Sequence, residues 1–186
     1  MRIAVYSGSF DPLHIGHLAI MDYLSRDSSF DWVYLVISPQ NPFKDASKAD
    51  NAQERFENAV AAVRRHPELH VWVDDIELRM GQPSYTIRTL DALREREPGN
   101  EFVLVMGADN LDAIRRWRDY ERILCEYGVA VYPRSGYDTE MIREGLYKEM
   151  KAPYRIQIID APTVDISSTS IREGEARGED MSEYRM

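Results

Sequence analysis

Six short apolar segments alternate with segments of helical periodicity, and this alternation constrains the fold more than any other feature of the sequence. The predicted strands cover residues 3–7, 32–38, 70–74, 102–106, 129–132 and 155–159. Several are apolar throughout, as is typical of strands covered by helices on both faces of a sheet. The repeated order of strand and helix predicts an α/β fold, a Rossmann-like doubly wound parallel sheet with helices on both faces.

The segments between these strands show helical spacing. Two groups of apolar residues are spaced to share one helix face each: Phe56, Val60 and Val63, and Ile87, Leu90 and Leu93. A length of 186 residues fits one domain, so we predict a single domain over 1–186. The charged tail over 173–186 is expected to begin as a helix and fray.

Composition excludes several classes of protein. The net charge of −9 argues against general affinity for nucleic acid. No apolar run is long enough to span a membrane, and the N-terminus lacks the regions of a signal peptide. One cysteine, Cys125, excludes an internal disulfide framework. These features predict a cytoplasmic protein without nucleic-acid or membrane partners.

The loop after the first strand carries the strongest chemical signal. It reads G-S-F-D-P-L-H-I-G-H from Gly8 to His17 and leads into a predicted helix. Gly8 would let the backbone approach a ligand, and a loop at a helix N-terminus favours a phosphate. His14 and His17 are three residues apart, so on a helix they share a face and can hydrogen-bond phosphate oxygens.

Other interpretations of the two histidines stay open. They could be half of a metal site, although zinc usually takes three or four protein ligands, and His66 and His70 lie in an unrelated segment. They could also be ordinary surface residues. The Walker motif and the dinucleotide fingerprint are both absent from the loop.

Two motifs together resemble a known superfamily. The G-S-F-D-P-x-H-x-G-H loop and the segment I-S-S-T-S-I-R at 166–172 are similar to the signatures of the HxGH nucleotidyltransferases. Segments 83–86, 106–111 and 117–124 resemble the bacterial nicotinate-nucleotide adenylyltransferases. The resemblance covers nearly the whole chain and ends near the C-terminus, so subunit assembly and a homo-oligomer are left open.

The resemblance implies adenylyl transfer from ATP to nicotinate mononucleotide, giving deamido-NAD and pyrophosphate. It implies catalytic roles for His14, His17, Lys44 and Arg172. The implied ATP contacts are Gly8, Ser9, Phe10, Gly107, Asp109, Ser168 and Thr169, and we add Arg134 because it follows the fifth predicted strand. The implied acceptor contacts are Thr86 and Trp117, with Arg118 adding positive potential. Mg²⁺ would be carried by the ATP phosphates, without dedicated protein ligands.

Each of these residues also has a structural interpretation. Lys44 could be solvated in its loop, and Asp109 could cap a helix that starts at Asn110. Trp117 could be core packing. Ser84 and Thr86, like Ser167 to Thr169, are residue types that cap helices.

Three other functions remain open at this point. The same chemistry could serve nicotinamide mononucleotide or phosphopantetheine. The chain could instead be an inactive nucleotide-binding module, or a structural or interaction protein.

Overall fold

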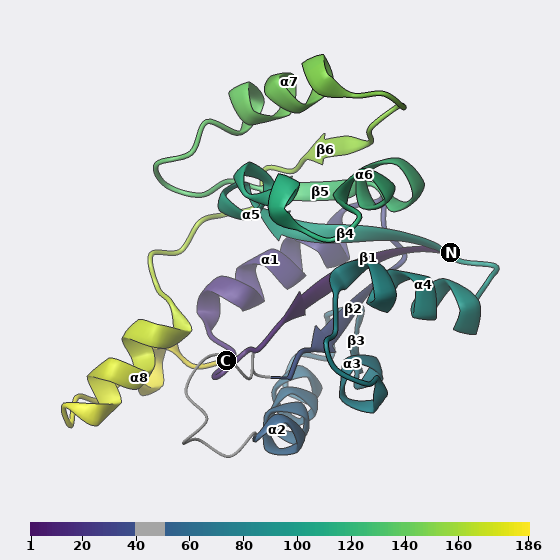
Figure 1. Cartoon of the computed structure of the whole chain (residues 1–186). Helices are drawn as coiled ribbons and strands as arrows, with labels where there is room; N and C mark the ends of the chain where they lie inside the picture. The colour runs from purple at the N-terminus through teal and green to yellow at the C-terminus, as the bar shows by residue number, and fades with distance from the viewer. Residues whose placement is uncertain (40–50) are drawn as a thin grey trace.

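A computed structural model describes residues 1–39 and 51–186 of the chain. Its strands form one parallel sheet in the order β3-β2-β1-β4-β5-β6 (Figure 1). The bounds are β1 Arg2–Gly8, β2 Trp32–Ile37, β3 Val71–Asp74, β4 Glu101–Gly107, β5 Val129–Tyr132 and β6 Ile156–Ile158. The chain starts in the middle of the sheet and winds outward in both directions, so the predicted doubly wound α/β fold is confirmed.

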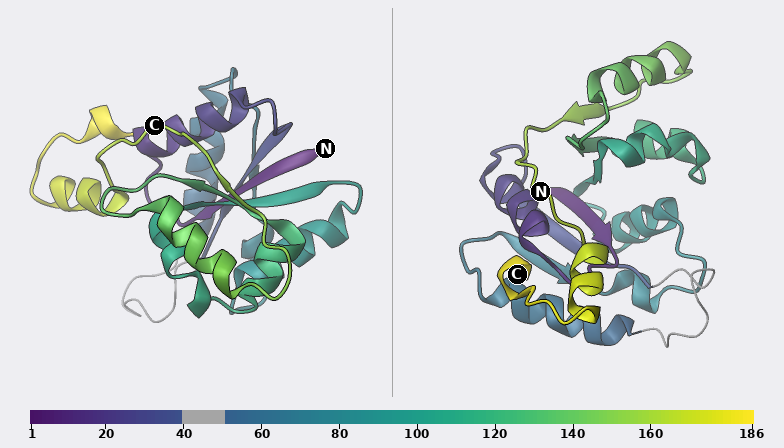
Figure 2. Two further views of the ribbon diagram at one scale, coloured as in Figure 1. Left: turned by 90° about the horizontal axis from the view of Figure 1, so that it is seen from above. Right: turned by 90° about the vertical axis from the view of Figure 1, so that its left-hand side faces the viewer.

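Helices cover both faces of the sheet (Figures 1 and 2). One face packs against α1 (Ile15–Arg26) and α2 (Ala52–Arg64), and the other against α4 (Thr86–Arg96), α5 (Ala108–Asp112) and α7 (Thr139–Glu149). The remaining helical pieces are short: α3 Ile76–Arg79, α6 Tyr120–Arg122, the 3-10 turns Ile114–Arg116 and Ser182–Tyr184, and the π-turn Ile123–Tyr127. No helix in the described ranges is both long and apolar enough to cross a membrane.

The helix α4 confirms its predicted apolar face, because Ile87, Leu90 and Leu93 are all buried. The predicted helix α2 is present, but its fully buried residues are not the predicted apolar group. Its buried residues are Ala52, Arg55, Ala59 and Ala62, while Phe56 and Val63 pack only at the margin of the core. The alanines recur at the same helical spacing and let the helix lie close to the sheet, which larger side chains would prevent.

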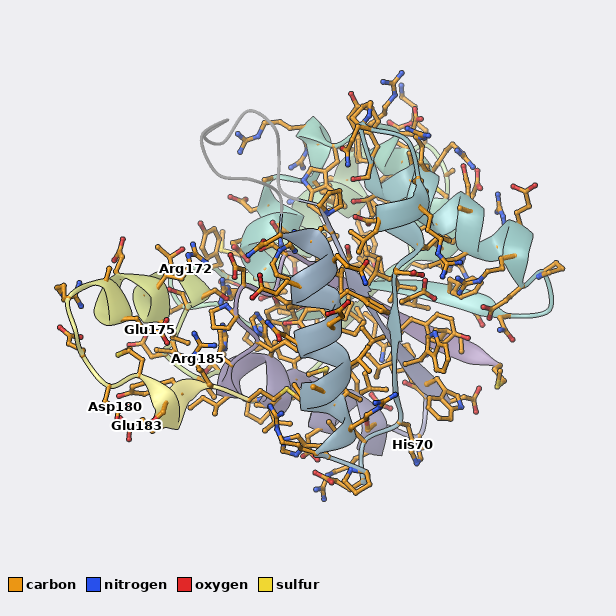
Figure 3. All side chains as sticks on the ribbon, turned by 90° about the horizontal axis from the view of Figure 1, so that it is seen from below. His70, Arg172, Glu175, Asp180, Glu183 and Arg185 are labelled. Atoms are coloured by element: carbon orange, nitrogen blue, oxygen red, sulfur yellow. The ribbon has the colours of Figure 1, made fainter. Side chains whose placement is uncertain are left out.

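The C-terminal segment differs from the frayed helix that we expected. Helix α8 (Ser168–Ala176) projects from the body of the molecule, and the chain then returns to the start of α1 (Figures 1 and 3). There the Met186 N–H donates to the Leu13 carbonyl at 3.3 Å, and Arg185 forms a β-bridge with His14. The Arg185 guanidinium pairs with Glu175 of α8 at 2.8 Å. This ion pair and the β-bridge are contacts that the charged composition of the tail did not reveal.

Candidate active site

The loops that follow β1, β2, β4 and β5 all leave the same edge of the sheet, because parallel strands end together there. In open α/β sheets this edge is where ligands bind. Neighbouring loops are joined by backbone contacts: the Ser38 N–H donates to the Gly8 carbonyl at 2.8 Å. The candidate site is built from these four loops and from α8.

The loop after β1 is shaped by Phe10. This residue has a positive φ of 47°, and its ring is buried against Tyr6 and His17. A Cβ atom on Gly8 would lie 3.1 Å from the Phe10 ring. Gly8 therefore makes room for the Phe10 ring, a reason that differs from the close ligand approach we expected. Only backbone groups of Phe10 remain for a nucleotide to contact.

His14 is the N-cap of α1, and it forms a capping box with His17. The His14 Nδ1 accepts hydrogen bonds from the Gly16 N–H at 3.0 Å and the His17 N–H at 3.4 Å. In return, the His14 N–H donates to His17 Nδ1 at 3.2 Å. The rings stack with their centroids 3.6 Å apart. A Cβ on Gly16 would lie 2.9 Å from the His14 ring, so glycine at this position permits the stack.

This arrangement fixes the protonation of both histidines. Because each Nδ1 accepts a backbone hydrogen bond, each neutral ring carries its proton on Nε2. Burial, together with the charge of Arg134, lowers the pKa of His14 to about 4, and burial, the neighbouring His14 and Arg134 lower that of His17 to about 3. The two rings are therefore neutral hydrogen-bond donors at physiological pH.

The expected backbone donors at the start of α1 are not free. The N–H groups of Gly16 and His17 are already bonded to His14. These two helix N-terminal amides are therefore bonded within the protein. Each imidazole keeps its Nε2–H as a hydrogen-bond donor, since its Nδ1 is used as an acceptor.

A third part of the site lies at the end of β4. Helix α5 begins directly after Gly107, so Asp109 lies in its first turn and does not cap a helix starting at Asn110. The Asp109 Oδ1 is 3.4 Å from Arg134 Nε, and no residue of the described ranges hydrogen-bonds to this buried oxygen. A Cβ on Gly107 would lie 2.5 Å from that oxygen, so only glycine leaves it room.

The loop after β1 also touches α8. Ser167 caps α8 by accepting from the Ser170 N–H at 3.0 Å, which confirms the capping interpretation for that residue. Ser168 donates its hydroxyl to the Pro12 carbonyl at 2.9 Å, and Arg172 donates to the Asp11 carbonyl. The two motifs that are 150 residues apart in sequence are therefore in direct contact.

A pocket of about 1390 Å³ opens between this loop, α2 and α8. Its lining includes Ser9, Ser168, Thr169, Arg172 and Arg185. Figure 3 shows Arg185 of the C-terminal segment next to Glu175 of α8, with which it forms an ion pair. The lining of the pocket places arginines beside two carboxylates, Glu54 and Glu175, and Arg172 is one of these arginines.

The residues predicted to bind the acceptor lie at the start of α4 and in the turn after α5. The N-cap of α4 is Tyr85, and neither Ser84 nor Thr86 caps it, which corrects that interpretation. No side chain of the described ranges caps this helix end. The Arg118 guanidinium lies 4.9 Å above the Tyr85 ring, next to the uncapped N-terminus. Trp117 is half-buried and packs against the hydrophobic core.

Two buried charged residues near the site were missed from the sequence. Arg55 is 2% exposed and donates to the carbonyls of Ser9 at 2.6 Å and Ser38 at 2.8 Å. Glu77 is 4% exposed and accepts from Ser7 and Thr89. A charged residue on a short or amphipathic helix is usually solvated, so the sequence carries no signal for either burial.

The remaining predicted residue, Lys44, lies outside the described residues. Within the described ranges, no group of three or more His, Cys, Asp or Glu is arranged to hold a metal ion.

Comparison with known proteins places these residues in a family. The cytidylyltransferase-like family model matches residues 5–174. A protein of Flavobacterium johnsoniae named "Probable nicotinate-nucleotide adenylyltransferase" is 37% identical over 97% of this chain and 90% of its own length. This chain belongs to the nicotinate-nucleotide adenylyltransferase family. Another family member with the same name, from Bacteroides fragilis, is 36% identical over 97% of this chain and 85% of its own.

Solved structures agree on the fold of this nicotinate-nucleotide adenylyltransferase family member. The nicotinic acid mononucleotide adenylyltransferase of Plasmodium falciparum, solved with NaAD, superposes with a TM-score of 0.78 over 97% of this chain and 87% of its own. A structure from Vibrio parahaemolyticus superposes with a TM-score of 0.66 over 100% of this chain and 93% of its own. Sequence identities of 20% and 22% limit this likeness to the fold.

Proposed function

We propose that this enzyme transfers the adenylyl group of ATP to nicotinate mononucleotide, giving deamido-NAD and pyrophosphate. The observation that carries the proposal is the pair of neutral imidazoles, His14 and His17, held at the sheet edge with both Nε2–H groups as donors. Two relatives that are 37% and 36% identical to this chain carry the name of this activity.

The reaction needs no protein nucleophile. An oxygen of the acceptor's phosphate attacks the α-phosphorus of ATP, and the bond from that phosphorus to the pyrophosphate oxygen breaks. The protein then contributes positioning and electrostatic stabilisation. We assign His17 to the α-phosphate, and His14, Lys44 and Arg172 to the transition state and the leaving pyrophosphate. Mg²⁺ would arrive on the ATP phosphates.

The geometry around the imidazoles supports the other ATP contacts that we propose. Ser9 and Phe10 offer backbone groups beside Gly8, and Ser168 and Thr169 line the pocket from α8. Asp109, with a buried oxygen that no described residue hydrogen-bonds, suits the two ribose hydroxyls, and Gly107 leaves space for it. Arg134 lies where its charge reaches both histidines, so it is also within electrostatic reach of the phosphates.

The start of α4 supports nicotinate as the base of the acceptor. A helix N-terminus without a side-chain cap presents unbonded N–H groups and the positive end of the helix dipole, which favour a carboxylate. Arg118 adds positive charge beside it, and Thr86 is the first helical residue. Trp117 would stack on the pyridine ring.

Nicotinamide mononucleotide is the second candidate acceptor, because its carboxamide has the same shape but no charge. An assay of pyrophosphate release with ATP and each acceptor tests the proposal. We expect kcat/KM to be about 10- to 100-fold higher for nicotinate mononucleotide, since the carboxamide NH₂ would face donors. Equal values would indicate dual specificity, and the absence of turnover with any acceptor would overturn the proposed function.

A further inference from the structure

Glu77 of α3 is a buried carboxylate at the carboxyl ends of β1 and β2. Its Oε1 accepts a hydrogen bond from the Thr89 hydroxyl at 2.9 Å and one from the Ser7 hydroxyl at 3.2 Å. The Ser7 and Ser38 hydroxyls are 3.0 Å apart and also hydrogen-bonded. We call these four residues the Glu77 cluster.

The members of the Glu77 cluster come from segments that carry different substrates in the proposed function. Ser7 directly precedes Gly8 and the loop assigned to ATP. Ser38 follows β2, and its N–H is bonded to the Gly8 carbonyl. Thr89 lies in the first turn of α4, and its N–H donates to the carbonyl of the N-cap residue Tyr85 at 3.2 Å. One carboxylate thus joins the ATP loop to the helix end assigned to the acceptor.

The energetics of the Glu77 cluster argue against a role in stability alone. Burial disfavours the charged carboxylate and raises the pKa of Glu77, while hydrogen bonds from Ser38, Thr89 and Ser7 act in the opposite direction. Within the described ranges no ion pair involves Glu77. A buried charge held only by hydroxyl groups is costly compared with apolar packing, but a satisfied network of this kind fixes one relative arrangement of the segments that it joins.

We propose that Glu77 is a positioning residue that sets the start of α4 against the loop after β1, so that the acceptor phosphate reaches the α-phosphorus of ATP in line. This inference rests on the proposed function. Glu77 itself touches neither substrate. It acts through Thr89 on the acceptor side and through Ser7 and Ser38 on the ATP side.

Steady-state kinetics on single and double variants test the positioning role. Removing the hydroxyl in Thr89→Val should raise KM for nicotinate mononucleotide about tenfold and leave KM for ATP unchanged. Glu77→Gln keeps the shape and should lower kcat by about tenfold while raising both KM values. The double variant Glu77→Gln/Thr89→Val should have the same acceptor KM as Glu77→Gln alone, because residues that act as one unit are not additive.

Two further variants separate positioning from stability. Thr89→Ser keeps the hydroxyl and should restore the wild-type acceptor KM. Glu95→Gln changes an exposed carboxylate on the same helix and should leave all kinetic constants unchanged. Circular dichroism and thermal unfolding on every variant identify any variant that fails to fold. If Glu77→Gln does not fold, the comparison of Thr89→Val with Thr89→Ser tests the positioning role alone.

The outcomes for the two proposals are distinct. If the wild type releases pyrophosphate but the folded Glu77 and Thr89 variants keep wild-type kcat and KM, the positioning role is wrong and the proposed function stands. The positioning role would also be wrong if the effects of the two substitutions on the acceptor KM multiplied in the double variant. If the wild type turns over no acceptor, the proposed function itself fails.

Discussion

His14 and His17 each accept a hydrogen bond from the backbone N–H of the other, at 3.2 Å and 3.4 Å, and their rings stack. The same two side chains thus cap the N-terminus of α1 and supply the Nε2–H donors of the candidate site. A change in either residue is therefore expected to affect both the stability of the helix and the binding of phosphate.

The first prediction concerns acid stability. Protonating Nδ1 would break the capping bonds, and the pKa values of about 4 and 3 lie below the ordinary 6.5 that the unfolded chain retains. The unfolded state therefore binds more protons below pH 6.5, and stability that is complete above this pH is lost as the pH falls through 4 toward 3. Asn is a good N-cap that does not titrate, so His14→Asn should show a smaller drop in melting temperature between pH 7.5 and 4.5. His70→Asn, a change at an exposed histidine, should match the wild type.

The second prediction concerns His17→Ala. We expect kcat to fall by about 10²-fold, since one donor to the reacting phosphate is lost. We also expect the free energy of unfolding to fall by about 1 kcal/mol, because the His14 N–H loses its acceptor. Pyrophosphate release and chemical denaturation measure the two effects. A folded variant with wild-type turnover would remove His17 from the mechanism.

The third prediction concerns Arg172, which is exposed at the rim of the pocket and also donates to the Asp11 carbonyl. Arg172→Ala should lower kcat by about 10²-fold and weaken ATP binding much less, because charge develops most in the transition state. Arg177→Ala removes an arginine just beyond the same helix that pairs with Glu179, and it should leave kcat unchanged. Near-normal turnover of Arg172→Ala would contradict the assignment.

The fourth prediction concerns Asp109. Asp109→Asn should raise KM for ATP about tenfold, because an amide group accepts fewer hydroxyl hydrogen bonds than a carboxylate. The difference between variant and wild type should vanish with 2′,3′-dideoxy-ATP, which lacks both ribose hydroxyls. Asp112→Asn, an exposed change on the same helix, serves as the control. A difference that persists with the dideoxy nucleotide would assign Asp109 to another contact.

The fifth prediction separates stacking from charge at the acceptor. Trp117→Ala should raise KM for both pyridine nucleotides alike, since a ring stack does not distinguish a carboxylate from a carboxamide. Arg118→Ala should instead narrow the ratio of their kcat/KM values by several-fold, because the lost charge favours only the carboxylate. Arg116→Ala is the matched control on the neighbouring turn. An unchanged ratio in Arg118→Ala would exclude that side chain from recognition.

The strands and the order of the elements could be predicted because apolar continuity and helical spacing are local signals. All six strands lie within one or two residues of their expected bounds, and Ile87, Leu90 and Leu93 face the core of α4 as expected. The loop from Gly8 to His17 and the segment from Ile166 to Arg172 were both assigned to the ATP site from the resemblance, and the structure brings them together at Pro12 and Ser168.

The misses share a physical cause, which is that they depend on contacts between distant segments. The burial of Arg55 depends on the carbonyls of two separate loops that it bonds. In α2 the alanines and the larger apolar residues recur at the same helical spacing, so periodicity alone does not tell which group faces the sheet. The alanines are the buried group because the helix packs closely on the sheet.

The two ends of the chain lie at different distances from the candidate active site. Met1 starts the central strand at the edge of the sheet opposite the site, where its amino group donates to Asn100. Met186 is tied to Leu13 and to Arg65 and lines the pocket between the loop after β1, α2 and α8. For anyone preparing this enzyme, an affinity tag or fusion partner belongs on the amino end, because the same extension on the carboxyl end would emerge beside the proposed ATP site.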